Sequence, residues 1–167
     1  MSNSILDQKK ILAVDDEQDI LDVLEKEITW SCSNCVFDKA RSYDEAVKLL
    51  QSKMYDLIVL DIMGVRGFDL LDIAVKNNLR AVMLTAHALS PENLKRAYDM
   101  GARAYLPKEK LKEIVPFLED ALKYDFESGW KRAYEALHDT FTAVWGRDWE
   151  KLEKATGSKL PRGSNGD

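Results

Sequence analysis

The sequence has few of the residues that mark disulfide scaffolds, membrane spans or nucleic-acid-binding surfaces. Its 167 residues include only two cysteines, and acidic residues outnumber basic ones by 29 to 24. No apolar stretch reaches the roughly 18 residues that a membrane-spanning helix needs. The net charge of −5 argues against nucleic acid as the main partner, because phosphate-binding surfaces usually carry a basic excess. We therefore expect a globular protein that binds neither membrane nor nucleic acid.

The N-terminal residues and the cysteines carry no targeting or metal signal. Met1–Ser4 lacks the basic-then-apolar pattern of a leader peptide, so we expect a cytoplasmic protein. Cys32 and Cys35 form a single C-x-x-C pair, and a zinc site would need two more ligands. The only histidines, His87 and His138, lie far along the chain. Because the pair follows a helical pattern, no helix N-terminus activates its thiols, and we expect reduced loop cysteines.

Short apolar runs alternate with amphipathic segments from the N-terminal region to Tyr124. The runs predict strands at 11–14, 36–40, 57–60, 81–84 and 104–106, and the segments between and after them predict helices, including 42–53, 90–100 and 110–124. Ser42 with Glu45 and Ser90 with Pro91 are suited to begin helices, and Gly101 is suited to end one. Five such alternations predict an α/β fold, a doubly wound parallel sheet with helices on both faces.

Reactive side chains stand where four of these strands end. They are Asp15 and Asp16 after the first strand, Asp61 after the third, Thr85 at the end of the fourth and Lys108 after the fifth. The carboxyl ends of parallel strands meet at one edge of the sheet, where ligands usually bind. Crowded carboxylates repel one another unless a cation intervenes. Mg2+, or alternatively Mn2+, would be bound by one or two of them and keep waters that a phosphate can replace.

A lysine and a hydroxyl facing the same point are suited to phosphoryl transfer, which depends on positioning and electrostatic stabilisation. Lys108 and Thr85 would hold the oxygens of the transferred group, and Asp61 would be the nucleophile that forms an acyl phosphate. A single aspartate at a strand end is more often a cap or turn residue. The ordered set of acids, hydroxyl and lysine on four strand ends is not expected by chance.

These residues lie in four motifs through which the chain resembles the receiver domains of two-component response regulators, from about Lys9 to Tyr124. The motifs are Val14-Asp-Asp-Glu17, Leu60-Asp-Ile-Met63, Leu84-Thr-Ala86 and Tyr105-Leu-Pro-Lys108. The resemblance implies a flavodoxin-like fold with strand order 2-1-3-4-5. It also implies a stand-alone signalling switch of a phosphorelay that catalyses its own Mg2+-dependent phosphorylation and dephosphorylation. A histidine kinase or a phosphotransfer protein would be the partner that donates the phosphoryl group.

The resemblance also assigns roles at the metal site. Asp61 is implied as the phosphoacceptor, and Asp16, Asp61 and the backbone carbonyl of Met63 as direct metal ligands. Asp15 would act on the metal through water. Two features depart from the usual family pattern: the loop 64–67 is shorter and lacks a proline, and Glu109 follows Lys108 where many receivers have a proline. Because a cis bond before a non-proline residue costs about 3 kcal/mol, we expect a trans bond there.

Further roles follow from the same resemblance. Thr85 would move toward the phosphoryl group while Lys108 pairs with it, and Tyr105 matches an aromatic residue that rotates inward with Thr85. A plain edge aromatic is the alternative for Tyr105. Met63 and His87, two residues past Asp61 and Thr85, would tune the lifetime of the phosphoryl group. For His87 an exposed loop histidine remains the alternative.

Three other functions are alternatives to this one. A phosphatase of the haloacid-dehalogenase type needs a second aspartate where Met63 stands. A flavin or nucleotide binder would carry a phosphate-binding loop after the first strand, where Asp15 to Glu17 would repel phosphate. A pseudo-receiver that acts as a constitutive interaction scaffold is the remaining alternative, and the intact set of acids, hydroxyl and lysine argues against it.

Beyond the predicted receiver of residues 1–124, residues 125–156 predict an amphipathic helical extension. Its aromatic and aliphatic stripe comprises Trp130, Ala133, Tyr134, Leu137, Phe141, Val144, Trp145 and Trp149. The extension is short and its charges are mixed, so we expect output by protein–protein interaction or dimerisation rather than DNA binding. The stripe would pack on its own receiver or on a second copy or another partner, with the partner slightly favoured. Residues 157–167 are rich in Gly and Ser and predict a disordered tail.

Overall fold

The computed structural model describes residues 4–86 and 90–146, which include a five-stranded parallel sheet. Its strands are β1 (Lys10–Val14), β2 (Val36–Ala40), β3 (Leu57–Leu60), β4 (Arg80–Thr85) and β5 (Ala104–Pro107). They lie side by side in the order β2-β1-β3-β4-β5, and every neighbouring pair is parallel. The predicted doubly wound, flavodoxin-like sheet with order 2-1-3-4-5 is therefore confirmed.

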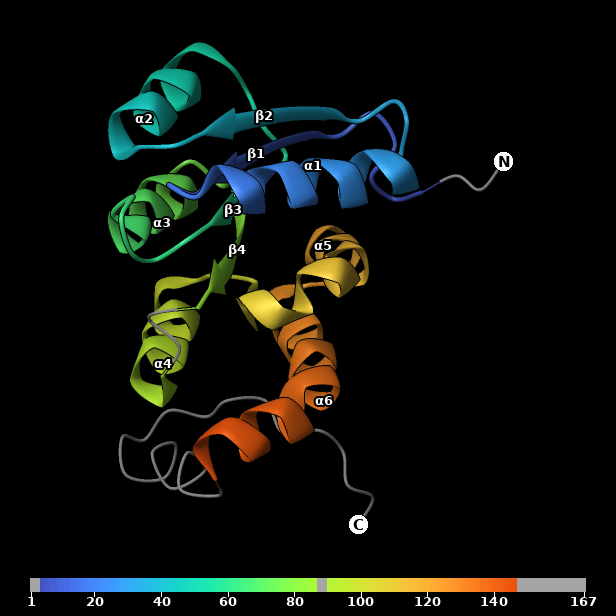
Figure 1. Cartoon of the computed structure of the whole chain (residues 1–167), viewed down its shortest axis with the longest axis vertical. Coiled ribbons are helices and arrows are strands. Elements are labelled where there is room, and N and C mark those ends of the chain that lie inside the picture. Colours follow the sequence, from blue (N-terminus) through green and yellow to red (C-terminus); the bar gives the residue numbers. More distant parts are fainter. Residues whose placement is uncertain (1–3, 87–89, 147–167) are drawn as a thin grey trace.

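Helices cover both faces of the sheet (Figure 1). They are α1 (Gln18–Ser31), α2 (Tyr43–Ser52), α3 (Gly67–Lys76), α4 (Pro91–Met100), α5 (Ile114–Lys123) and α6 (Phe126–Trp145), with a 3-10 helix η1 (Lys108–Glu113) before α5. Helices α1 and α5 contact each other on one face, while α3 contacts both α2 and α4 on the other. Among the described residues no helix is long and apolar enough to cross a membrane.

The residues that were expected to begin and end helices do so in the structure. The Ser42 hydroxyl accepts a hydrogen bond from the Glu45 amide (3.2 Å), and Gly101 ends α4 with a φ of 99°, a value that favours glycine. The predicted helix 110–124 is too long, because its first residues form η1 and the α-helix begins only at Ile114. Pro116 thus lies in the first turn of α5, where its missing N–H removes no helical hydrogen bond.

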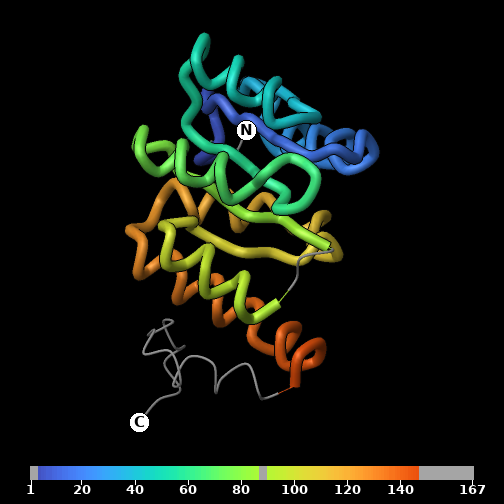
Figure 2. The backbone as a smooth tube through the Cα atoms, turned by 90° about the vertical axis from the view of Figure 1, so that its left-hand side faces the viewer, coloured from blue at the N-terminus to red at the C-terminus, as the bar shows by residue number. Residues whose placement is uncertain are grey.

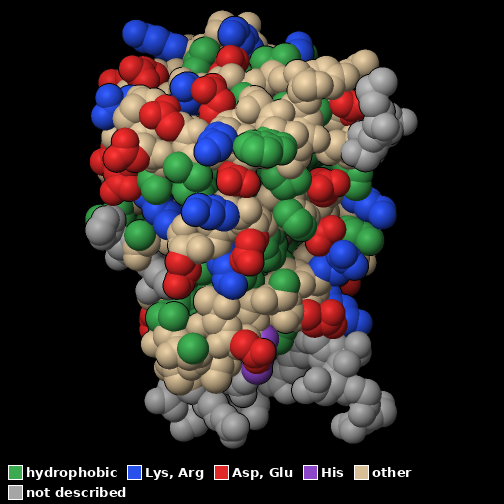
Figure 3. All heavy atoms as spheres, turned by 45° about the vertical axis from the view of Figure 1, so that its right-hand side comes forward, with side chains coloured by type: hydrophobic (Ala, Val, Ile, Leu, Met, Phe, Trp, Pro, Cys, Tyr) green, Lys and Arg blue, Asp and Glu red, His purple; other side chains and the backbone are tan. Residues whose placement is uncertain are grey.

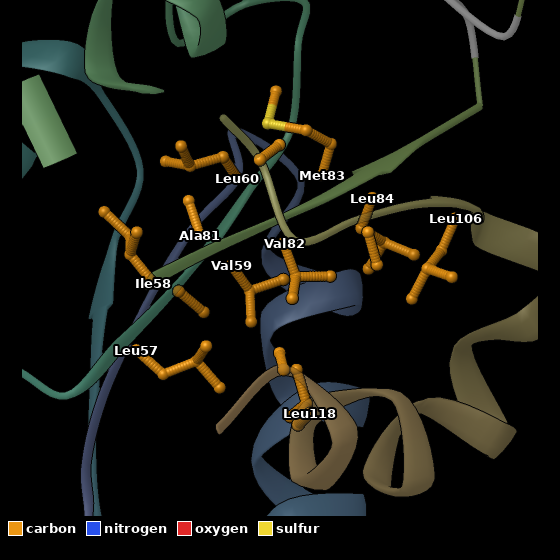
Figure 4. Packing of buried hydrophobic residues seen from close by; sticks show 14 of the residues in the cluster. Leu57, Ile58, Val59, Leu60, Ala81, Val82, Met83, Leu84, Leu106 and Leu118 are labelled. Atoms are coloured by element: carbon orange, nitrogen blue, oxygen red, sulfur yellow. The ribbon is translucent and has the colours of Figure 1, made fainter. Parts of the chain in front are cut away.

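The apolar core lies in and around the central strands. Leu57–Leu60 of β3 and Ala81–Leu84 of β4 are all buried, and Figure 4 shows part of their packing. Strands buried on both faces are apolar throughout rather than alternating, which explains the continuous apolar runs in the sequence. The edge strand β2 differs, since Val36 at its start is 45% exposed. The core therefore holds β1, β3 and β4 rigidly, and their carboxyl ends are fixed with them.

Helix α6 packs back on the sheet edge at β5, beside α5 (Figure 2). Trp130, Ala133, Leu137 and Phe141 of its stripe are buried. The sequence-based preference for a partner as the cover of this stripe is therefore wrong for these four residues, because the chain covers them itself. Trp149, the end of the 125–156 extension and the 157–167 tail lie outside the described residues.

Both cysteines are free thiols in the segment between α1 and β2, as expected. Cys32 directly follows α1 and is buried, and the Cys35 thiol donates a hydrogen bond to the Cys32 carbonyl oxygen (3.0 Å). Burial and the neighbouring Cys32 raise the pKa of Cys35 to about 11. A thiol with such a pKa is a weak nucleophile at neutral pH.

Candidate functional site

The predicted acidic residues meet at the carboxyl edge of the sheet because β1 and β3 are in register. Val14 pairs with Leu60, so the residues that follow them, Asp15 and Asp61, lie next to each other. The backbone N–H of Asp61 donates to the carbonyl oxygen of Val14 (3.0 Å), which extends the ladder to the acid itself. The strand pairing thus positions both carboxylates without any flexible loop.

Three carboxylates form a compact cluster at this edge. One oxygen from each of Asp15, Asp16 and Asp61 lies within 4.8 Å of the other two. Asp15 and Asp61 are 2% and 5% exposed, whereas Asp16 is exposed. Two of these carboxylates are buried and the third faces solvent. Such a set fits Mg2+, which binds a few carboxylates and keeps its remaining positions for water or phosphate. The three predicted carboxylates are therefore brought together, while the roles of Asp15, Asp16, Asp61 and the Met63 carbonyl toward a metal remain predictions.

Lys108 reaches into the cluster from the end of β5. Its Nζ lies 2.9 Å from Asp15 Oδ2 and 3.3 Å from both Asp61 Oδ2 and Glu17 Oε2. Burial alone would lower the pKa of Lys108, but the hydrogen bond to Asp15 and the surrounding negative charges outweigh it and leave the pKa raised. Lys108 is therefore a fixed cation. The sequence showed Glu17 in the acidic run but gave no sign that it would contact this lysine.

Negative charges outnumber positive ones in the cluster, and the effect is seen in the pKa of Asp61. Burial, together with the nearby charge of Asp15, raises the pKa of Asp61 to about 6, against the opposing effect of Lys108. Burial also raises the pKa of Asp15, although the Glu17 N–H and Lys108 both favour its charged form. A second cation would relieve both carboxylates. The site thus has an excess of negative charge that a divalent cation would neutralise.

We expect Asp61→Asn to raise the free energy of unfolding by about 2 to 3 kcal/mol at pH 7 in Mg2+-free buffer. The folded-state pKa of Asp61 lies above the unfolded-state value, so its charged form destabilises the fold. The gain is full above pH 6, shrinks as the pH falls toward 4 and is absent below that. Urea denaturation across this pH range measures it, with the exposed Asp72→Asn as control. A gain that persists at pH 3 would contradict this electrostatic origin.

Thr85 and Tyr105 are both completely buried. Thr85 ends β4 at the same sheet edge as Asp61, and Tyr105 lies in β5, where its hydroxyl accepts a hydrogen bond from the Ser90 N–H (3.1 Å) at the start of α4. Tyr105 is thus a buried aromatic of the edge strand β5, and its rotation with Thr85 remains a prediction. Met63 is 54% exposed in the loop after Asp61, and His87 lies outside the described residues, so their tuning roles remain predictions.

The short loop after Asp61 depends on two glycines. Gly64 has a φ of +82°, and a side chain there would overlap the Asp16 carboxylate. A methyl group on Gly67 would overlap the backbone carbonyl oxygen of Asp61. The loop therefore packs directly against two members of the acidic cluster. Among the described residues every peptide bond is trans, including the one between Lys108 and Glu109.

Comparison with known proteins gives a consistent result for the larger part of the chain. The family model for the response regulator receiver domain matches residues 11–118. The receiver domain of NtrX from Brucella abortus is 30% identical, with a TM-score of 0.61, over 69% of this chain and 99% of that one. A CheY-like receiver domain protein from Methanospirillum hungatei is 25% identical, with a TM-score of 0.61, over 68% of this chain and 93% of that one.

A response regulator from Thermotoga maritima, only 15% identical, shares the fold with a TM-score of 0.63 over 70% of this chain and 99% of that one. The search of curated proteins gave no match. The match to the family model ends at residue 118 and so does not include α6 or the residues after it. The part of the chain that they cover contains the complete carboxylate cluster, Thr85 and Lys108.

Proposed function

The chain belongs to the response regulator receiver domain family, and on this basis we propose that Asp61 accepts a phosphoryl group as an acyl phosphate. The observation that carries the proposal is the position of the Asp61 carboxylate. It is buried in a cluster of acids, and its Oδ2 lies 3.3 Å from Lys108 Nζ. A positioned carboxylate beside a fixed cation is what nucleophilic phosphoryl transfer needs.

In the transfer, a carboxylate oxygen of Asp61 forms a bond to the phosphorus while the bond from phosphorus to the donor's nitrogen or oxygen breaks. The Ile62 N–H donates to Asp61 Oδ1 (2.9 Å) and so orients the nucleophile. Lys108 neutralises charge on the phosphoryl oxygens, and the Thr85 hydroxyl donates to one of them once it approaches. Asp15, Asp16 and Asp61 would hold Mg2+, which supplies further neutralisation of the phosphoryl oxygens when bound.

The donor is a histidine kinase or a phosphotransfer protein, and the output is a protein–protein interaction or dimerisation rather than DNA binding. In support, acidic and basic side chains are interspersed on the face shown in Figure 3, without the basic patch that DNA contact favours. In further support, α6 is the single described helix beyond the five of the receiver fold. The expected cytoplasmic location stays a prediction.

Incubation with acetyl phosphate and Mg2+, followed by intact-mass spectrometry, tests the proposal. We expect one added phosphoryl group on the wild type and none on Asp61→Asn, because the amide is not a nucleophile for this reaction. Asp72→Asn, an exposed aspartate on α3 that pairs with Lys76, is the matched control and accepts the group like the wild type. If the folded wild type takes up none, the constitutive scaffold becomes the better account.

A further inference from the structure

The first half of α6 is anchored to the receiver by Trp130. The indole N–H of Trp130 donates to the carbonyl oxygen of Ala102 (2.6 Å), in the turn between α4 and β5. Its ring meets Tyr98 of α4 edge-on, with centroids 5.2 Å apart, and only 3% of the residue is exposed. A buried tryptophan with its N–H satisfied is a strong anchor. This end of α6 is therefore held independently of the acidic cluster.

The second half of α6 rests on Tyr105. The Phe141 ring lies with its centroid 6.5 Å from that of Tyr105, and both residues are almost completely buried. Tyr105 lies in the edge strand of the sheet, and α6 contacts that strand. The hydroxyl of Tyr105 meanwhile accepts from the Ser90 N–H where α4 begins. One side chain thus contacts both the start of α4 and the far half of α6.

Tyr105 is also connected to the acidic edge through the sheet. Thr85 pairs with Pro107, and Met83 pairs with Tyr105. Paired residues of neighbouring strands point to the same face, and so do residues two apart along a strand. Thr85 and Tyr105 are therefore diagonal neighbours on one face of the sheet, within reach of a large aromatic side chain. Thr85 ends β4 at the same sheet edge as Asp61, and the large buried side chains that follow it on this face are Met83 and Tyr105.

We propose that α6 is an intramolecular ligand of the α4–β5 surface and that phosphorylation of Asp61 releases its second half through Thr85 and Tyr105. The inference rests on the proposed function. When Thr85 moves to bond the phosphoryl group, the buried Tyr105 shifts toward the space that it leaves, since close-packed interiors do not keep voids. That shift takes the ring away from Phe141 and removes the packing beneath the second half of α6.

Hydrogen exchange of the full-length chain tests this coupling. Amide exchange within 126–145 is measured by mass spectrometry with Mg2+ alone and with Mg2+ plus acetyl phosphate, on samples whose phosphorylation is confirmed by intact mass. We expect phosphorylation to speed exchange about fivefold or more in the half of α6 around Phe141. The half around Trp130 responds less, because its anchors do not involve Tyr105.

Two variants distinguish a release of α6 that depends on the Phe141 contact from a general loosening of the helix. In Phe141→Ala the second half of α6 exchanges fast already without acetyl phosphate, and phosphorylation adds little. Val144→Ala changes an exposed side chain of the same helix (51% exposed) and keeps the wild-type response. If the wild type takes up no phosphoryl group, the proposed function fails and this inference with it. If it is phosphorylated and exchange in α6 stays the same or slows, the inference alone is overturned.

Discussion

Lys108→Ala is expected to slow phosphorylation by acetyl phosphate about 100-fold or more at pH 7 with saturating Mg2+. Lys108 Nζ contacts Asp15 and Asp61 at once, so it is a fixed cation directly beside the proposed phosphoacceptor. Its loss removes charge stabilisation in the transition state and leaves two buried carboxylates to repel each other. The rate of mass gain under pseudo-first-order conditions measures the effect.

The control for this prediction is Lys110→Ala, two residues further along. Lys110 pairs with Glu113 at the surface rather than with the acidic cluster, so its removal leaves the rate within about twofold. Lys108→Arg keeps the charge with a different shape and should recover part of the rate. A Lys108→Ala variant that is folded and phosphorylated at the wild-type rate would remove this residue from the mechanism.

Gly67→Ala is expected to lower the free energy of unfolding by about 3 kcal/mol or more. The added methyl group meets the backbone of Asp61 and Ile62 rather than a flexible side chain, so either the loop or α3 must shift. Because the displaced backbone carries the phosphoacceptor, phosphorylation should slow as well. Urea denaturation in Mg2+-free buffer measures the stability change.

Gly129→Ala is the matched control. Gly129 lies inside α6, where an added methyl group makes only ordinary contacts of 3.8 and 3.9 Å. Alanine is favoured over glycine in a helix by up to about 1 kcal/mol, so this variant should be as stable as the wild type or slightly more so. If Gly67→Ala were equally harmless, the short loop would not be packed on the Asp61 backbone as described.

The fold and most of the site were predictable because parallel strands bring their carboxyl ends together. The apolar runs before Asp15 and Asp61 predicted two parallel strands, so the acids that follow them were expected at one edge of the sheet. The same reasoning placed Thr85 and Lys108 at that edge. The order that makes the first and third strands neighbours came from the family resemblance, because apolar runs reveal the identity of strands but not their order.

Features that depend on long-range packing were not predictable. The stripe on α6 indicates that Trp130 and Phe141 must be covered, yet it does not say by which surface, and the slight preference for a partner was wrong for the four stripe residues that the receiver itself buries. The close approach of Gly67 to Asp61 depends on the loop path, which no periodicity reveals. Likewise, burial of Cys32 and the contact between Glu17 and Lys108 arise from the three-dimensional arrangement alone.

The most direct test of the central claim locates the phosphoryl group on the chain. Borohydride reduces an aspartyl phosphate to homoserine, and peptide mass spectrometry then identifies the converted position after treatment with acetyl phosphate and Mg2+. We predict homoserine at position 61 alone, with Asp15 and Asp16 unchanged. Homoserine at Asp15 or Asp16, or a phosphate that resists borohydride, would contradict Asp61 as the nucleophile.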